Sequence, residues 1–167
     1  MDQKEMTFVF PAVPDNAGAL SALPEASLLT PFQTAALSLL ALLSYERDPE
    51  AAYAMLDFLK GPETVSVYEK QFLRDRLQGK IYVVRSFFQG ASPENGYTPS
   101  RPFTITVSAG PYSFPEENWA VLYVKSSGAD SPRPVKLRRK PSTGQWFLNE
   151  LQCLASIRLP AEEDPWA

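Results

Sequence analysis

Residues 119–158 constrain the fold more than any other stretch of the chain. They read WAVLYVKSSGADSPRPVKLRRKPSTGQWFLNELQCLASIR, in which runs of apolar and β-branched residues are separated by two turn signals. The turn signals lie at 128–132 and 142–144, and their glycine, aspartate, serine and proline residues favour tight reversals of the chain. Strands joined by such short turns pair antiparallel, so this stretch predicts an antiparallel meander.

Three helix signals precede this sheet. The first two are a Thr-Pro and an Asp-Pro pair, which place a capping side chain before a proline, and the third is a Ser-x-x-Glu capping box. Apolar residues at helical spacing follow each signal and predict helices over 30–44, 48–60 and 66–79. Helices followed by antiparallel strands are typical of the α+β class, with three helices packed on a C-terminal sheet.

The first of these helices is apolar on nearly every side. Leu37 and Leu42 fall outside the stripe formed by its other large side chains. A helix of this kind either lies at the centre of the core or is half covered by a partner subunit.

The remaining segments complete a single predicted domain over 1–167. Its parts are a loosely structured lead-in (1–29, extended at 7–13), a helical part (30–79) and a sheet part (80–167, with further strands at 81–84 and 103–107). Two loops rich in proline and glycine or aromatic residues, 90–102 and 110–118, interrupt the sheet part. The sheet is predicted to be a meander with helices on one face, or a cone similar to the nuclear-transport-factor-like fold.

Composition limits the chemistry that the chain can perform. The 167 residues include no histidine, which excludes a Ser-His-Asp or Cys-His catalytic set and an imidazole zinc site. The one cysteine, Cys153, lies in an apolar run and reads as a buried hydrophobic residue. Neither a phosphate-binding loop nor a dinucleotide fingerprint occurs. We therefore expect no metal, no cofactor and no catalytic residue.

Charge and hydropathy bear on location and partners. The net charge of −3 does not favour a nucleic-acid-binding domain. The first ten residues do not resemble a secretory leader, and the longest apolar run, 35–43, is shorter than a membrane span. These features lead us to expect a cytoplasmic chain with no membrane association.

A basic segment at 125–140 interrupts this mildly acidic composition. It contains six basic residues and one acidic residue. Strand alternation predicts that Val135 and Leu137 face the core while Lys136, Arg138 and Lys140 face outward, with aromatic side chains of neighbouring strands beside them. The outward side is either an ordinary solvated face or a surface for an anionic ligand.

The candidate ligand-binding residues lie in this segment and in the two loops. Aromatic side chains in the loops and strands, with Trp119, would anchor a partner, and Asp130 with Arg133 would supply charge in a turn. They are Tyr97, Tyr112, Phe114, Tyr123, Asp130, Arg133, Lys136 and Arg138.

From about residue 55 onward the sequence resembles an uncharacterised bacterial family of small domains of unknown function. The resemblance is carried by FLKGP (58–62), YEKQFLRDRLQGK (68–80), GASPENGYTP (90–99), GADSPRP (128–134), TGQWFL (143–148), IR (157–158) and EDPWA (163–167). It implies one folded unit that includes the last residues, so that Trp166 would pack against the body. It implies no activity and no functional residue.

Three functions remain open from sequence. We favour a non-enzymatic binding or protein-interaction domain, whose partner is a protein or a small anionic ligand. The second is an enzyme that uses Asp130 as a base and the arginines Arg133 and Arg138 to hold an anionic substrate. The third is a structural subunit of a homo-oligomer that buries helix 30–44 between subunits.

Overall fold

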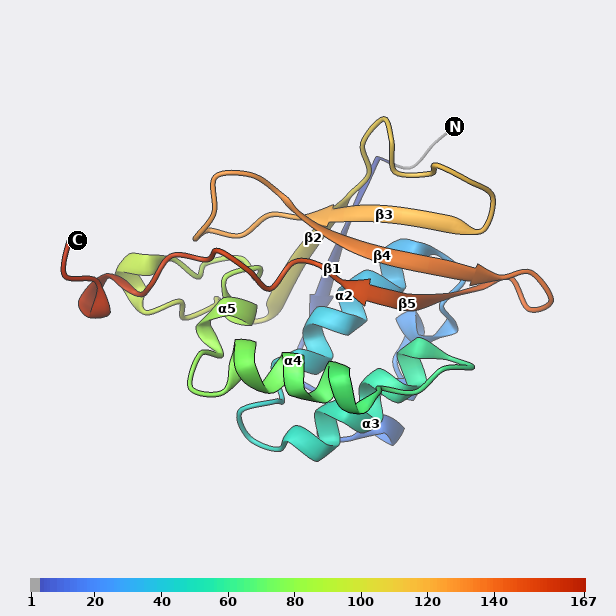
Figure 1. Cartoon of the computed structure of the whole chain (residues 1–167), viewed down its shortest axis with the longest axis horizontal. Coiled ribbons are helices and arrows are strands. Elements are labelled where there is room, and N and C mark those ends of the chain that lie inside the picture. Colours follow the sequence, from blue (N-terminus) through green and yellow to red (C-terminus); the bar gives the residue numbers. More distant parts are fainter. Residues whose placement is uncertain (1–3) are drawn as a thin grey trace.

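The computed structural model describes residues 4–167, and in it a five-stranded antiparallel sheet curls around one helix (Figure 1). The strands follow the order β1-β2-β3-β4-β5, so each pairs with its neighbour in sequence. They are β1 (Glu5–Phe10), β2 (Phe103–Ser108), β3 (Trp119–Val124), β4 (Arg133–Lys140) and β5 (Gln145–Leu151). The predicted α+β class with an antiparallel meander is confirmed.

The helices lie mostly between β1 and β2 in the sequence. They are α1 (Ala17–Ser21), α2 (Pro31–Leu42), α3 (Pro49–Lys60), α4 (Val67–Leu77) and α5 (Tyr82–Arg85), with short 3-10 turns η1 (Pro24–Ser27), η2 (Pro93–Asn95) and η3 (Ala161–Glu163). The three predicted helices correspond to α2, α3 and α4. Their predicted caps are present, since Thr30, Asp48 and Ser66 each accept a hydrogen bond from a backbone N–H of the first turn.

Helix α2 forms the centre of the core. Every one of its residues except Gln33 is buried, and the helix packs against all five strands. Its polar side chains are satisfied inside the core: Thr34 donates to the Trp146 carbonyl at 2.6 Å, and Ser38 donates to the Thr34 carbonyl at 2.7 Å. Of the two environments predicted for this helix, the structure shows burial within the chain's own core.

The curl of the sheet arises between β2 and β3. These strands pair only at Val107–Val124 and Ser108–Tyr123, and then diverge. Neighbouring loops occupy the opening, since Gln89 donates its N–H to the Thr104 carbonyl at 2.8 Å and Val121 donates to the Ser113 carbonyl at 2.7 Å. The concave side holds α2 (Figure 1), so the sheet is neither flat nor a cone around an open pocket.

The strand predicted at 81–84 is wrong, because Tyr82, Val83 and Val84 lie in α5 and Ile81 is its N-cap. Ile81, Val83 and Val84 are buried in the core, and Tyr82 stacks on Tyr97. A run of four apolar residues is too short to distinguish the period of a strand from that of a helix. Its conformation is therefore decided by the residues that pack around it.

The predicted lead-in is more regular than expected. Its extended piece is β1, which pairs along its whole length with β2 and buries Phe8 and Phe10. Two helical turns, α1 and η1, follow before α2. At the other end of the sheet, β5 ends at Leu151, and residues 152–158 form no strand.

Trp166 does not pack against the body of the protein, contrary to the expectation from sequence. Its side chain is 92% exposed. The segment before it contacts the body through η3, which lies beside η2. The tryptophan therefore contributes no buried surface to the folded chain.

Substituting Leu40→Ala should lower the free energy of unfolding by about 2–5 kcal/mol, because the leucine is fully buried in the last turn of α2. Urea unfolding followed by circular dichroism measures the change. Val9→Ala is the control, since Val9 is 54% exposed on β1 and should cost less than about 1 kcal/mol. Equal losses in the two variants would contradict the central position of α2.

Substituting Trp166→Ala should leave the melting temperature within about 2 °C of the original value, because the side chain is exposed. Differential scanning calorimetry at low protein concentration provides the measurement. A clear decrease would mean that the tryptophan packs on the body after all.

Candidate functional site

The outward side of β4 carries an uninterrupted row of cations. The side chains of Val135 and Leu137 point into the core and are fully buried. On the outward face of the strand, Arg138 and Lys140 are exposed and Lys136 is half-buried. The alternation predicted from sequence for this strand is therefore present. It follows from the pleat, which directs successive side chains to opposite faces.

Aromatic rings lie among these cations. Trp119 of β3 is paired across the sheet with Arg138, and Phe147 of β5 is paired with Arg138 on the other side. The Lys136 ammonium and the Arg138 guanidinium lie 5.0 Å and 5.1 Å from the centre of the Trp119 ring. This geometry is a cation–π arrangement with two cations on one indole. We call Trp119, Lys136, Arg138, Lys140 and Phe147 the basic face.

In the described part of the chain, the cations of the basic face form no close ion pair, and the nearest acidic neighbour along the sheet is Glu150 of β5, which is paired across the strands with Lys136. Among residues 4–167, no carboxylate lies within 4.0 Å of Lys136, Arg138 or Lys140. The ion pairs found in that part of the chain involve other cations, at Arg47, Lys60, Arg85 and Arg158. Like charges on one strand repel, so an anion bound here would relieve repulsion as well as gain attraction.

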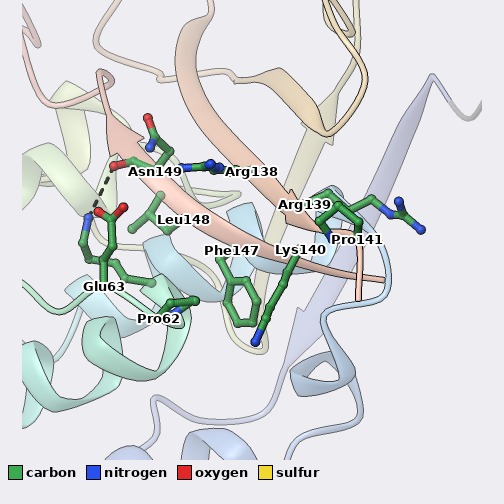
Figure 2. A pocket seen from close by; sticks show the side chains of 10 residues that line it. Pro62, Glu63, Arg138, Arg139, Lys140, Pro141, Phe147, Leu148 and Asn149 are labelled. Atoms are coloured by element: carbon green, nitrogen blue, oxygen red, sulfur yellow. Dashed lines mark hydrogen bonds between the residues drawn. The ribbon is translucent and has the colours of Figure 1, made fainter. Parts of the chain in front are cut away.

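A pocket of about 240 Å³ opens beside the basic face. Its walls come from β4, β5 and the connection between α3 and α4, and Figure 2 shows Lys140 extending along the Phe147 ring with Pro62 nearby. Arg139 contributes to the rim but points away from the ring, where it donates to the Asn118 side chain at 3.2 Å. The one acidic lining residue is Glu63.

Gly61 allows the two segments of this pocket to meet. Its φ of +69° lies in the left-handed region, and a Cβ atom at this position would collide with the Phe147 ring. The glycine therefore ends α3 and seats the ring at the same time. The sequence predicts only that the helix ends at residue 60, because the contact between Gly61 and Phe147 joins residues far apart in the chain.

A buried lysine closes the inner end of the pocket. Lys60 is 6% exposed, and its ammonium donates to Glu69 at 2.8 Å and to the Asn149 carbonyl at 3.3 Å. Asn149 is the extra residue of a β-bulge, since β4 pairs Lys136 with Glu150 and Leu137 with Leu148. The bulge directs the Asn149 carbonyl toward Lys60, as the dashed line in Figure 2 shows.

The Lys60–Glu69 pair perturbs the titration of the acid. Burial alone would raise the pKa of Glu69, but hydrogen bonds from Lys60 and from the Ser66 backbone, together with the Lys60 charge, lower it overall below 4.5. Sequence reasoning assigned Glu69 only to the cap of α4. It missed Lys60, which as the last residue of α3 reads as an ordinary solvated cation.

The predicted loop aromatics lie in different environments. Tyr97 is fully buried and donates its hydroxyl to the Arg158 carbonyl at 2.7 Å. Tyr112 is 84% exposed, and Phe114 packs edge-on against Trp146 with ring centres 6.5 Å apart. None of the three contacts or lines the pocket beside the basic face.

The remaining predicted residues surround the turn after β3. The Asp130 carboxylate is 93% exposed and accepts from Arg158 at 3.0 Å. Arg133 donates to the Ser131 hydroxyl at 3.0 Å and to the Ser156 carbonyl at 3.1 Å. Tyr123 is paired with Pro134 on the outward side of the sheet. Of the eight predicted residues, the structure thus places only Lys136 and Arg138 in the basic face.

Other chemical features of the chain are few. Cys153 is buried, and burial raises the pKa of its thiol to about 12, so it is not a thiolate at neutral pH. In the described residues, no three or more histidine, cysteine, aspartate or glutamate side chains gather as a metal would require. The helices of residues 4–167 include none with the length and apolar composition of a membrane span.

A family model matches most of the chain. A family model described as Domain of unknown function (DUF6935) matches residues 12–161. No curated protein and no solved structure matches the chain. The matched range contains all of the basic face and the pocket.

Substituting Glu69→Gln should lower the free energy of unfolding by about 1–3 kcal/mol at neutral pH, because the buried Lys60 ammonium loses its charged partner. The matched control is Glu63→Gln, which changes the same residue type on the same pocket without an ion pair and should cost less than about 1 kcal/mol. Chemical denaturation of the three proteins gives the comparison.

The difference in the free energy of unfolding between the wild type and Glu69→Gln should also depend on pH. Because the folded-state pKa of Glu69 is lowered, its stabilisation is complete above its ordinary value of 4.5 and is lost as the pH falls through the folded-state pKa. The gap between wild type and Glu69→Gln should therefore narrow below about pH 4. A difference in the free energy of unfolding that stays constant down to a pH of about 2 would contradict stabilisation by the charged Lys60–Glu69 pair.

Proposed function

The chain belongs to the family described as Domain of unknown function (DUF6935), and from its geometry we propose a protein-interaction domain, not an enzyme, whose basic face binds an acidic segment of a partner protein. The observation that carries the proposal is a set of three cations without a close ion pair among residues 4–167 (Lys136, Arg138 and Lys140), arranged around two aromatic rings beside a pocket.

Charge and shape together favour an acidic peptide segment. Carboxylates accept strong charge-assisted hydrogen bonds from guanidinium and ammonium groups. The pocket of about 240 Å³ is smaller than the roughly 300–1,000 Å³ of typical small-molecule sites, and it suits a single side chain. The open sheet face beside it suits the rest of an extended segment. The ligand that matches both parts is acidic and carries one large apolar side chain.

A nucleic acid matches less well. The chain has a net charge of −3 and a pI near 5.1, so its overall field opposes a polyanion of high charge density. A short acidic segment carries fewer charges and contacts only the basic face. The proposal therefore names a protein partner.

The two other functions considered from sequence receive less support. An enzyme that uses Asp130 would need the carboxylate in a pocket with Arg138, but Asp130 is exposed, is paired with Arg158 and does not line the pocket that Arg138 lines. A homo-oligomer that buries α2 is not required, because the chain's own sheet covers this helix.

The proposal also places this interaction in the bacterial cytoplasm. The single cysteine is consistent with a reducing compartment, since Cys153 is buried and takes part in no disulfide. Cell fractionation with an antibody against the chain checks this part of the proposal, and recovery outside the cytoplasm would contradict it.

The basic face should bind a short oligo-glutamate peptide, and Arg138→Glu should weaken that binding about tenfold or more, because it removes at least one charge-assisted hydrogen bond. Fluorescence anisotropy of the labelled oligo-glutamate peptide titrated with the full chain gives the dissociation constant. Affinity should fall as salt rises from about 0.05 M to about 0.5 M, since the Debye length shortens.

The matched control is Lys80→Glu. Lys80 is exposed after α4, outside the basic face, and the substitution changes the net charge by the same amount. The affinity of the Lys80→Glu chain for the same peptide should stay within about twofold of the wild-type value. No binding at low salt, or equal losses in the two variants, would contradict the proposed function.

A further inference from the structure

The segment at residues 161–167, which we call the acidic tail, is largely exposed, with only Ala161 and Asp164 half-buried. Its sequence is AEEDPWA, with three consecutive carboxylates before Trp166. At 92% exposure, Trp166 is the most exposed large apolar side chain in the described part of the chain. Exposed tryptophans are frequent anchors of protein interfaces.

The structure holds this tryptophan outward on a turn. Asp164 accepts from the Trp166 N–H through its carboxylate at 2.8 Å, and from the Ala167 N–H through its carbonyl at 3.2 Å. Pro165 occupies the second position of the turn, where its fixed φ restricts the chain before binding. A segment restricted in this way loses less conformational entropy when it binds.

The charge of the acidic tail is not balanced locally. Among residues 4–167, none of Glu162, Glu163 and Asp164 forms an ion pair with a basic side chain. The acidic tail therefore has the two properties required of a ligand for the basic face. It carries adjacent carboxylates and one large apolar side chain.

We propose that the acidic tail of one copy of this chain binds the basic face of a second copy, with Trp166 in the pocket beside Phe147. The carboxylates before it would then lie against Arg138 and Lys140, and the indole would contact Phe147 and Pro62. This inference rests on the proposed function and names its partner as the chain itself.

The contact must be between copies. Figure 1 places the acidic tail and the β4–β5 hairpin at opposite ends of the longest axis. A seven-residue segment extends about 25 Å at most, whereas a compact chain of this length is about 40 Å across. The tail therefore does not reach the pocket of its own copy.

The symmetry of the contact determines the kind of assembly. Each copy offers one tail and one basic face, so reciprocal exchange of tails would close two copies into a two-fold dimer, whereas one-way contacts would join copies head to tail. One side chain and a few exposed charges make a small interface, so the association should be weak and should depend on protein concentration and salt.

A labelled peptide of residues 160–167 tests the contact directly. It is titrated with the full chain carrying Trp166→Ala, so that the chain's own tail does not compete. We expect binding that weakens about tenfold or more when Arg138→Glu is added to the chain, and by a similar factor when the peptide's tryptophan is replaced by alanine. Adding Lys80→Glu to the chain instead should leave the affinity within about twofold.

Sedimentation velocity on mixed variants tests the tail-to-face contact between copies. The wild-type chain should form larger species as its concentration rises, whereas Trp166→Ala alone and Arg138→Glu alone should stay monomeric. Mixed together, these two variants retain one intact face and one intact tail. The mixture should form one-to-one dimers and nothing larger, because each dimer has used its only complementary pair.

The outcomes separate this inference from the proposed function. If the oligo-glutamate peptide binds the basic face but the tail peptide does not, the partner is another protein and the self-contact is overturned. If neither binds, both proposals fall. Peptide binding that is insensitive to Arg138→Glu, or wild-type assembly that persists in Trp166→Ala, also overturns the self-contact.

Discussion

The burial of α2 inside the curl of the sheet determines the positions of the other elements. A helix that is apolar on nearly every side must be covered on every side, and a flat sheet covers only one. The sheet meets this requirement because β2 and β3 diverge after two paired positions and the sheet curls around the helix. Where these strands no longer pair, the backbone of Gln89 bonds to β2 and that of Ser113 bonds to β3. The outward side of β3, β4 and β5 thereby remains free of helices and open to ligands.

A second constraint connects the core to the basic face. The bulge at Asn149 inserts one extra residue into β5 and presents a carbonyl to the buried ammonium of Lys60. Glu69 provides the charge that Lys60 needs in this buried position. The same contacts fix the end of α3 against β5, where Gly61 accommodates Phe147. The pocket is therefore built on rigid elements, which suits recognition of a ligand with little rearrangement.

The sequence predicted the parts of this site that depend on local period, and missed those that depend on distant contacts. Alternation along β4 correctly separates Leu137 from Arg138, because a pleated strand has a period of two. Residues 81–84 were predicted to be a strand because four apolar residues have no measurable period, and the core around Val84 selects a helix. The roles of Lys60 and Gly61 depend on β5, which lies far away in the sequence.

The sequence by itself determined the α+β class, the three long helices with their caps, and the outward direction of the cations on β4. Each of these features is set within a few residues, by capping hydrogen bonds or by side-chain period. Only the tertiary structure decided the curl of the sheet, the pocket beside Phe147 and the exposure of Trp166. It also decided the regular structure of the first thirty residues, which form β1, α1 and η1. These depend on which distant surfaces meet, because burial is a property of the packed chain and not of any single segment.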